Sequence, residues 1–197
     1  KHDARNPYDN KFYEDVFYSR ISDEGWLGAK PLSKKINSTD NDAMVGISND
    51  ENAIYIYTGK YEKNIHKGVF NAKKGKWKSP KEISKKLRSD QAEGSLFFSP
   101  SGDTMYFISA DEELAIGGKD ILMSIKNEKG KWTDPVSAGS LINSSFDEEG
   151  IYITPDSKEL YFSSKGHNSM GGFDVFHSVR LDDGTWSDPE NMGYPIN

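Results

Sequence analysis

Short apolar segments alternate with turn residues along the whole chain, and none keeps the 3.6-residue apolar period of a helix. The clearest segments are aromatic or β-branched and follow turns of Pro, Asp, Ser or Gly, as strands do. They lie at 53–58, 104–109 and 159–164. Nearly continuous apolar stretches precede those turns, at 44–47, 95–98 and 151–153. Third strands are predicted at 15–19, 69–72, 120–124 and 174–178. The pattern predicts an all-β chain of short antiparallel strands.

Tryptophan marks a repeat in this pattern. The four Trp residues, Trp26, Trp77, Trp132 and Trp186, are separated by 51, 55 and 54 residues, and the last three are each followed by Pro at the same offset. A period of this length indicates one supersecondary unit copied several times. We expect each Trp to open a fourth, edge-like strand and to pack where one unit meets the next, since Pro is tolerated at a sheet edge.

Four antiparallel strands in each unit predict a β-propeller. About three and a half blades are present: a half blade at 1–41 and blades at about 42–92, 93–147 and 148–197, which together form a single propeller segment. A closed ring needs four or more blades. The segment is therefore expected to be part of a larger propeller.

The composition of the chain disfavours some classes of partner and excludes some kinds of site. The chain of 197 residues has a net charge of −6, which disfavours nucleic acid as a partner. No apolar run approaches the roughly 20 residues of a membrane span, so we expect no direct membrane insertion by this segment. The sequence contains no Cys, which excludes disulfides and thiol nucleophiles.

The turn and strand motifs resemble a known family. Residues 98–107 (FSPSGDTMYF) and 153–162 (ITPDSKELYF) are similar to the core of the WD40-like repeat of TolB-type β-propellers. Residues 171–176 (GGFDVF) and 186–193 (WSDPENMG) resemble the ending of a subgroup found beside OmpA-type domains in outer-membrane and type IX secretion-linked proteins. The resemblance implies a periplasmic, outer-membrane-associated, non-catalytic module. Its partners would be other cell-envelope proteins, with a linked peptidoglycan-binding domain outside this chain.

Chain direction predicts which loops bind. The long loops 3–14, 59–67, 111–119 and 165–173 share one face of the blades and differ from unit to unit, as ligand-binding loops on rigid scaffolds do. We expect partner contacts there, or else loops that merely cover the blade tops. The candidate contacts are Arg5, Tyr8, Tyr61, His66, Asp111, Glu112, His167 and Asn168.

One acid recurs before each innermost strand, as Asp42, Glu93 and Glu148. These acids are expected to be structural, bonded to backbone N–H groups or basic side chains; a ring of carboxylates for a cation is the alternative. The histidines show no metal-ligand spacing. We therefore predict no metal site, no cofactor, no catalytic residue and no enzyme activity.

The sequence thus favours a protein–protein interaction scaffold of the bacterial cell envelope. The alternative is a carbohydrate-binding or glycan-processing propeller, which exposed Tyr and Trp side chains on the loop face would favour. A structural spacer without a ligand is a third hypothesis.

Overall fold

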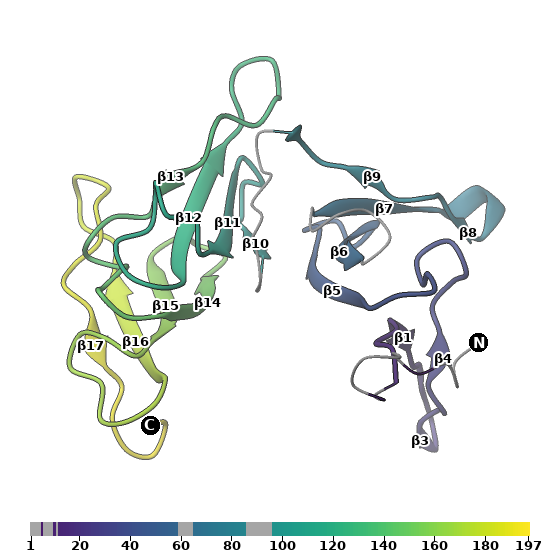
Figure 1. Ribbon diagram of the computed structural model, residues 1–197, viewed down its shortest axis with the longest axis horizontal. Helices are drawn as coiled ribbons and strands as arrows, with labels where there is room; N and C mark the ends of the chain where they lie inside the picture. Colours follow the sequence, from purple (N-terminus) through teal and green to yellow (C-terminus); the bar gives the residue numbers. More distant parts are fainter. Residues whose placement is uncertain (1–4, 6–9, 11, 59–64, 86–95) are drawn as a thin grey trace. The chain divides into compact units, whose positions relative to one another are not determined.

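The computed structural model describes residues 5, 10, 12–58, 65–85 and 96–197 (Figure 1). They form antiparallel strands joined by turns, loops and a short 3-10 helix, Ala72–Lys74. The chain divides into two compact units, residues 1–85 and 86–197. Each unit is described by itself below.

The second unit contains two four-stranded antiparallel sheets. The first sheet has the order β10 (Leu96–Phe98), β11 (Thr104–Ser109), β12 (Asp120–Ile125), β13 (Val136–Ser137). The second has the order β14 (Glu148–Ile153), β15 (Glu159–Ser164), β16 (Asp174–Val179), β17 (Glu190–Asn191). Neighbouring strands are consecutive in the chain, which is the up-and-down order of a propeller blade.

A shared apolar core joins these two sheets. Ile108 and Ile121 of the first sheet pack with Leu160, Phe162 and Phe176 of the second, all at most 2% exposed. Each such buried side chain contributes about 1.5–3 kcal/mol relative to an exposed one. The pairing register Ile108↔Ile121 and Phe162↔Phe176 sets these residues side by side on one face of each sheet. Alternation along the strands thus decides which residues form the core.

The first unit contains a larger sheet and two short ribbons. Its sheet has the order β5 (Asp42–Ile47), β6 (Ala53–Thr58), β7 (His66–Asn71), β8 (Lys76–Trp77), and β9 (Lys81–Glu82) also pairs with β7. The ribbons pair β1 (Phe17–Tyr18) with β4 (Lys30–Pro31), and β2 (Ile21–Ser22) with β3 (Gly25–Trp26). Val16, Ile36, Ile54 and Ile56 form a buried cluster against which Trp77 packs.

The outer edge of each sheet differs from the prediction. Trp132 and Trp186 do not open a strand; each forms an isolated bridge, with Lys126 and Arg180 respectively. The outer strand, β13 or β17, begins only after the following Pro. Proline has no N–H to donate to a ladder, so it divides the edge into two short pairings.

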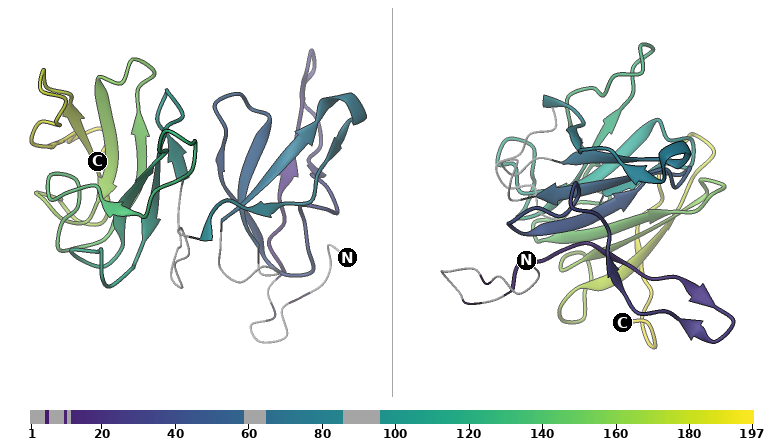
Figure 2. Two further views of the ribbon diagram at one scale, coloured as in Figure 1. Left: turned by 90° about the horizontal axis from the view of Figure 1, so that it is seen from above. Right: turned by 90° about the vertical axis from the view of Figure 1, so that its right-hand side faces the viewer.

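Trp26 is a second correction. Its side chain is 74% exposed, so the expectation that it packs at a junction between units is wrong. In Figure 2 the dark purple hairpin that carries β2 and β3 extends away from the sheet of its unit. The Trp26 backbone pairs with Ile21 in a two-residue ribbon, and its indole is a member of neither core cluster described above. Trp186, in contrast, packs against the core between two sheets.

The predicted fold class is confirmed. The second strands lie at 53–58, 104–109 and 159–164, as the sequence predicts. The main shift is in β7, which begins at His66 although the sequence places the third strand at 69–72. The first strands begin earlier than expected, because β5 and β14 include Asp42 and Glu148.

Candidate functional site: the long-loop face of the second unit

Three connections meet at one end of the strands in the second unit. They are the loop 110–119 after β11, the linker 138–147 before β14 and the loop 165–173 after β15. The Glu148 N–H donates to the Lys119 carbonyl at 2.6 Å, and the Lys165 N–H donates to the Asp147 carbonyl at 2.9 Å. We call the surface made by these three connections the loop face.

Asp147 holds the three connections together. Its Oδ1 accepts from the Lys119 N–H at 3.1 Å, and its Oδ2 pairs with the Lys165 ammonium at 2.8 Å. The bond from the Lys165 side chain, followed by that from the Lys119 backbone, lowers the pKa of the Asp147 carboxyl. The carboxylate is therefore ionised at neutral pH. Its role is to fix the loops, and sequence reasoning did not single it out.

Glycines allow these connections to touch backbone to backbone. A Cβ at Gly117 would lie 2.6 Å from the Phe146 carbonyl oxygen, and a Cβ at Gly166 would lie 2.0 Å from Ser144 Oγ. Real Cβ atoms do not approach other atoms so closely, so a larger residue at either position would force the loop away from the linker. The glycines thus serve close packing of the loop face.

Glu148 is buried behind the loop face. Its carboxylate accepts from Ser144 Oγ and Ser164 Oγ, both at 2.6 Å, and from the Ser144 N–H at 3.1 Å. Burial raises the pKa of Glu148, and the nearby Asp120 carboxylate raises it further, while the hydrogen bonds act in the opposite direction. The side chain is 0% exposed, so its bonding is internal to the protein.

Asp42 occupies the equivalent place in the first unit. Its Oδ2 accepts from the Ser38 N–H, four residues earlier, as Glu148 accepts from Ser144. Both acids therefore bond backbone N–H groups of the preceding linker. Glu93, the third acid of the series, lies outside the described residues. No group of three or more metal-ligating side chains occurs in the part of the chain that the structure describes.

A recurring asparagine was missed in the sequence. Asn143 accepts from the Ile121 N–H at 2.9 Å and donates to the Ile121 carbonyl at 2.8 Å, so its amide acts like a neighbouring strand residue. Asn37 makes the same pair of bonds with Val16, and Asn197 makes it with Val175. The signal was available, because each of these Asn residues follows an Ile.

Of the predicted contacts, four lie in the loops of the second unit. Asp111 Oδ1 accepts from the Glu113 N–H at 3.0 Å, so its carboxylate shapes its own loop. The His167 ring packs near Phe162 and Phe176, and its Nε2 lies 3.0 Å from the Ile142 carbonyl oxygen. Glu112 and Asn168 are exposed.

The other predicted contacts fall elsewhere. His66 is the first residue of β7 and is 7% exposed, so its placement in a loop is wrong; the strand extends three residues earlier than the apolar pattern indicates. Arg5 belongs to the first unit, where its guanidinium lies 4.0 Å from the centre of the Phe12 ring and donates to the Asn10 carbonyl at 2.7 Å. Tyr8 and Tyr61 lie outside the described residues.

The loop face is hollowed and partly apolar. A cavity of about 450 Å³ is lined by residues that include Glu112, Gly117 and Asp147. Five large apolar side chains of these three connections are exposed, listed here with their exposed fractions: Ile116 51%, Leu141 41%, Phe146 57%, Met170 64% and Phe173 39%. Lys165 connects two parts of this surface, because its ammonium pairs with Asp147 and lies 4.7 Å from the Phe173 ring centre.

Comparison with known proteins places the chain by fold. No family model matches the sequence, and no curated protein matches it. Among solved structures, TolB from Acinetobacter baumannii is similar with a TM-score of 0.52 and 15% identity, covering 97% of this chain and 40% of that one. Puromycin hydrolase is similar with a TM-score of 0.50 and 11% identity, covering 93% of this chain and 29% of that one.

The chain therefore spans less than half the length of these two proteins. In the described residues, no helix is both long and apolar enough to span a bilayer. At this level of identity the similarity concerns the fold. The four-stranded antiparallel sheets of this chain are blades of a β-propeller, the fold that it shares with TolB.

Proposed function

We propose that this chain is a non-catalytic protein-binding scaffold of the bacterial cell envelope, and that the loop face of its second unit is the binding surface. The observation that carries the proposal is the group of exposed apolar side chains Ile116, Phe146, Met170 and Phe173 on connected loops. Large apolar patches on a soluble surface mark interaction sites. A periplasmic, outer-membrane-associated location belongs to the same proposal and is supported by the sequence resemblance.

The chemistry of the face also favours binding over catalysis. Asp147 pairs with Lys165, Asp111 bonds its own loop, and Glu148 is buried among hydroxyls. These carboxylates are engaged in fixing backbone segments. Protein interfaces typically have an apolar centre and a polar rim. The loop face has the same arrangement, with fixed polar groups around exposed apolar side chains.

A capture experiment tests the proposal. The 197-residue chain, immobilised, would be exposed to a detergent-solubilised envelope fraction of the source bacterium, and bound proteins would be identified by mass spectrometry. The double variant F146S/M170S removes apolar groups of the loop face. Its control, I125S/L181S, removes two apolar groups that are 43% and 46% exposed near the opposite ends of the strands.

We expect a specific envelope protein to be retained by the wild type and the control and to be lost from F146S/M170S. Equal capture by all three proteins would refute the role of this face. Binding of glycans in place of a protein, tested on an array of cell-wall saccharides, would support the carbohydrate-binding alternative.

A further inference from the structure

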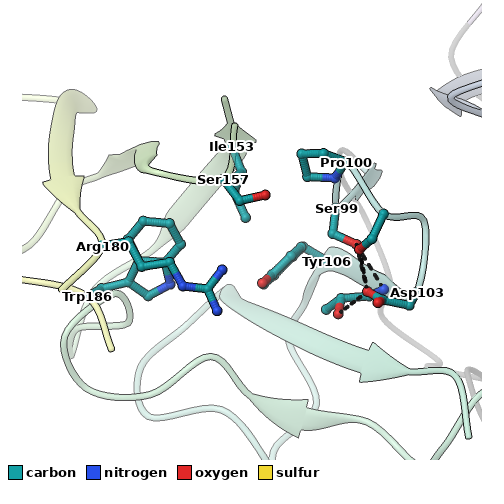
Figure 3. Close-up of a pocket in the computed structure, with 10 residues that line it drawn as sticks. Ser99, Pro100, Asp103, Tyr106, Ile153, Ser157, Arg180 and Trp186 are labelled. Atoms are coloured by element: carbon teal, nitrogen blue, oxygen red, sulfur yellow. Dashed lines mark hydrogen bonds between the residues drawn. The ribbon is translucent and has the colours of Figure 1, made fainter. Parts of the chain in front are cut away.

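A second cavity lies at the opposite end of the strands, between the two sheets of the second unit. It has a volume of about 280 Å³ and is lined by residues that include Asp103 and Tyr106 from the first sheet and Ser157, Arg180 and Trp186 from the second. Figure 3 shows these side chains around a common space. The turn 99–103 connects β10 to β11, whereas the loop face begins at the other end of β11, so the two surfaces are distinct.

Arg180, an exposed residue, brings to this cavity a cation whose terminal nitrogens have no partner among the described residues. Its Nε donates to the Gly184 carbonyl at 3.3 Å, and its guanidinium lies 5.7 Å from the Trp186 ring centre. Among the residues that the structure describes, its two terminal nitrogens have neither a hydrogen-bond acceptor nor a carboxylate partner. In Figure 3 the guanidinium points toward the Tyr106 hydroxyl. Four N–H donors are thus available on the cavity side.

Tyr106 supplies a second donor. Burial raises the pKa of its hydroxyl, so the group stays protonated and can donate a hydrogen bond at neutral pH. The hydroxyl has no hydrogen-bond partner within the described ranges. The cavity therefore presents two terminal guanidinium nitrogens and a phenol hydroxyl that lack acceptors among the described residues.

Asp103 lines the same cavity, but its carboxylate is hydrogen-bonded within its own turn and not to Arg180. Its Oδ1 accepts from the hydroxyls of Ser101, Ser99 and Thr104 at 2.7, 3.0 and 3.1 Å. These bonds, that from Ser101 foremost, lower the pKa of Asp103 and tie the carboxylate to its own turn. Asp103 makes no ion pair with Arg180 in the described part of the chain.

The preceding repeat provides an internal comparison. Lys126 stands where Arg180 stands, since each forms the bridge to the Trp of its repeat. The Lys126 ammonium lies 4.8 Å from the Trp132 ring centre but donates to the Gly102 carbonyl at 2.7 Å. The terminal nitrogen of the equivalent cation thus has a carbonyl partner in one repeat, whereas in the next the terminal nitrogens of Arg180 have none among the described residues.

We propose that the cavity between the sheets binds a carboxylate group, held by the Arg180 guanidinium and the Tyr106 hydroxyl beside Trp186. The planar guanidinium matches a carboxylate with two parallel hydrogen bonds, which is the strongest common form of such recognition. The carboxylate belongs to an acidic side chain of a bound peptide segment or to a small acidic ligand such as a sugar acid. The shared chemistry is the same in both cases.

Titration followed by nuclear magnetic resonance tests this proposal. The readout is the indole N–H signal of Trp186 in the ¹⁵N-labelled full chain, assigned with the variant W186F. The probes are the blocked peptide acetyl-Gly-Glu-Gly-amide with its Gln counterpart, and glucuronate with glucose. We expect a saturable shift with each carboxylate that fits and none with its neutral counterpart.

Matched variants then assign the donors. R180Q should weaken binding at least tenfold and R180K less, because lysine keeps the charge but loses the planar fork. Y106F should weaken binding by a smaller factor. The control R20Q removes the same charge from the first unit, six residues before Trp26, and should leave binding unchanged.

The possible outcomes are distinct. A shift with the Glu peptide alone supports a protein carboxylate, and a shift with glucuronate alone supports a sugar acid. Failure of both probes to move the Trp186 signal up to 10 mM, or equal weakening by R180Q and R20Q, would overturn the proposal. The loop face is a different surface, so the result of this titration does not decide the result of the capture experiment. The two proposals can therefore fail separately.

Discussion

Replacing Asn143 by alanine tests the most specific structural device of the second unit. The Asn143 amide exchanges two hydrogen bonds with the backbone of Ile121 and donates a third to Ser137 Oγ at 3.0 Å. Asn143 is 1% exposed and Ile121 is 0% exposed, so water cannot replace these bonds without opening the core. The variant N143A would leave the buried Ile121 N–H unpaired, whereas the Ile121 carbonyl would still accept from the Ala138 N–H at 3.0 Å.

The expected loss follows from that N–H group. A buried backbone N–H left unsatisfied costs roughly 1–3 kcal/mol, so N143A should lower the free energy of unfolding by about 2 kcal/mol. This is a large share of the 5–15 kcal/mol that is typical of a domain. Asn197 makes the same pair of bonds with Val175 but is only partly buried, so water can take its place. N197A should therefore cost less than about 1 kcal/mol.

Urea denaturation followed by Trp fluorescence measures both variants. In the background W26F/W77F the remaining Trp132 and Trp186 both lie in the second unit and report its unfolding. Hydrogen exchange at the Ile121 amide gives a local readout, which should accelerate in N143A. The reasoning is refuted if N143A lies within 1 kcal/mol of its parent, or if N197A costs as much as N143A.

Two further predictions concern the loop face. G166A should destabilise the second unit by about 2 kcal/mol, because its Cβ would overlap Ser144 Oγ, whereas G171A, with nothing within 4 Å of its Cβ, should be near neutral in the same denaturation assay. The contributions of Asp147 and Glu148 to the free energy of unfolding should change in opposite directions as the pH is varied. The lowered pKa of Asp147 means that its contribution is present above its ordinary value of 3.8 and is lost as pH falls through its folded pKa. The raised pKa of Glu148 means that its contribution is present below 4.5 and is lost as pH rises through its folded pKa. Unfolding of D147N and E148Q from pH 3 to 8 checks this; parallel profiles for the two variants would contradict it.

The sequence predicts the strands well where local chemistry decides them. Strand β11 is bounded by a Pro- and Gly-containing turn and filled with aromatic and β-branched residues, so its limits follow from neighbouring residues. His66 is the opposite case. A polar residue at the start of a strand carries no apolar signal, and its burial depends on pairing with Glu82 of β9.

The edge of each sheet could not be predicted from the Trp repeat. The regular spacing indicates a shared role for the four tryptophans, but burial depends on what each indole meets. Trp186 meets the core of two packed sheets, whereas Trp26 lies on a two-stranded ribbon. The same regular spacing of Trp residues therefore leads to different environments.

The candidate site, too, was predicted from the sequence only in part. The sequence predicted the loops of the loop face, because the direction of consecutive antiparallel strands fixes which connections share an end. It did not predict which side chains would be exposed there. Asp111 bonds within its own loop and His167 contacts the Ile142 carbonyl of the linker, while Phe146 and Met170, which apolar character would assign to a core, are exposed.

By itself the sequence determined the strand period, the blade-like repeat and the faces on which the loops lie, since these depend on alternation, turn residues and chain direction. Tertiary structure decided which polar groups are satisfied and which are left open. Arg180 and Lys126 occupy equivalent positions, yet the Lys126 ammonium donates to the Gly102 carbonyl of a distant turn, whereas among the described residues Arg180 donates only through its Nε, to the Gly184 carbonyl of its own turn. Hydrogen-bond partners come from segments that are distant in the chain, so their presence is a property of packing.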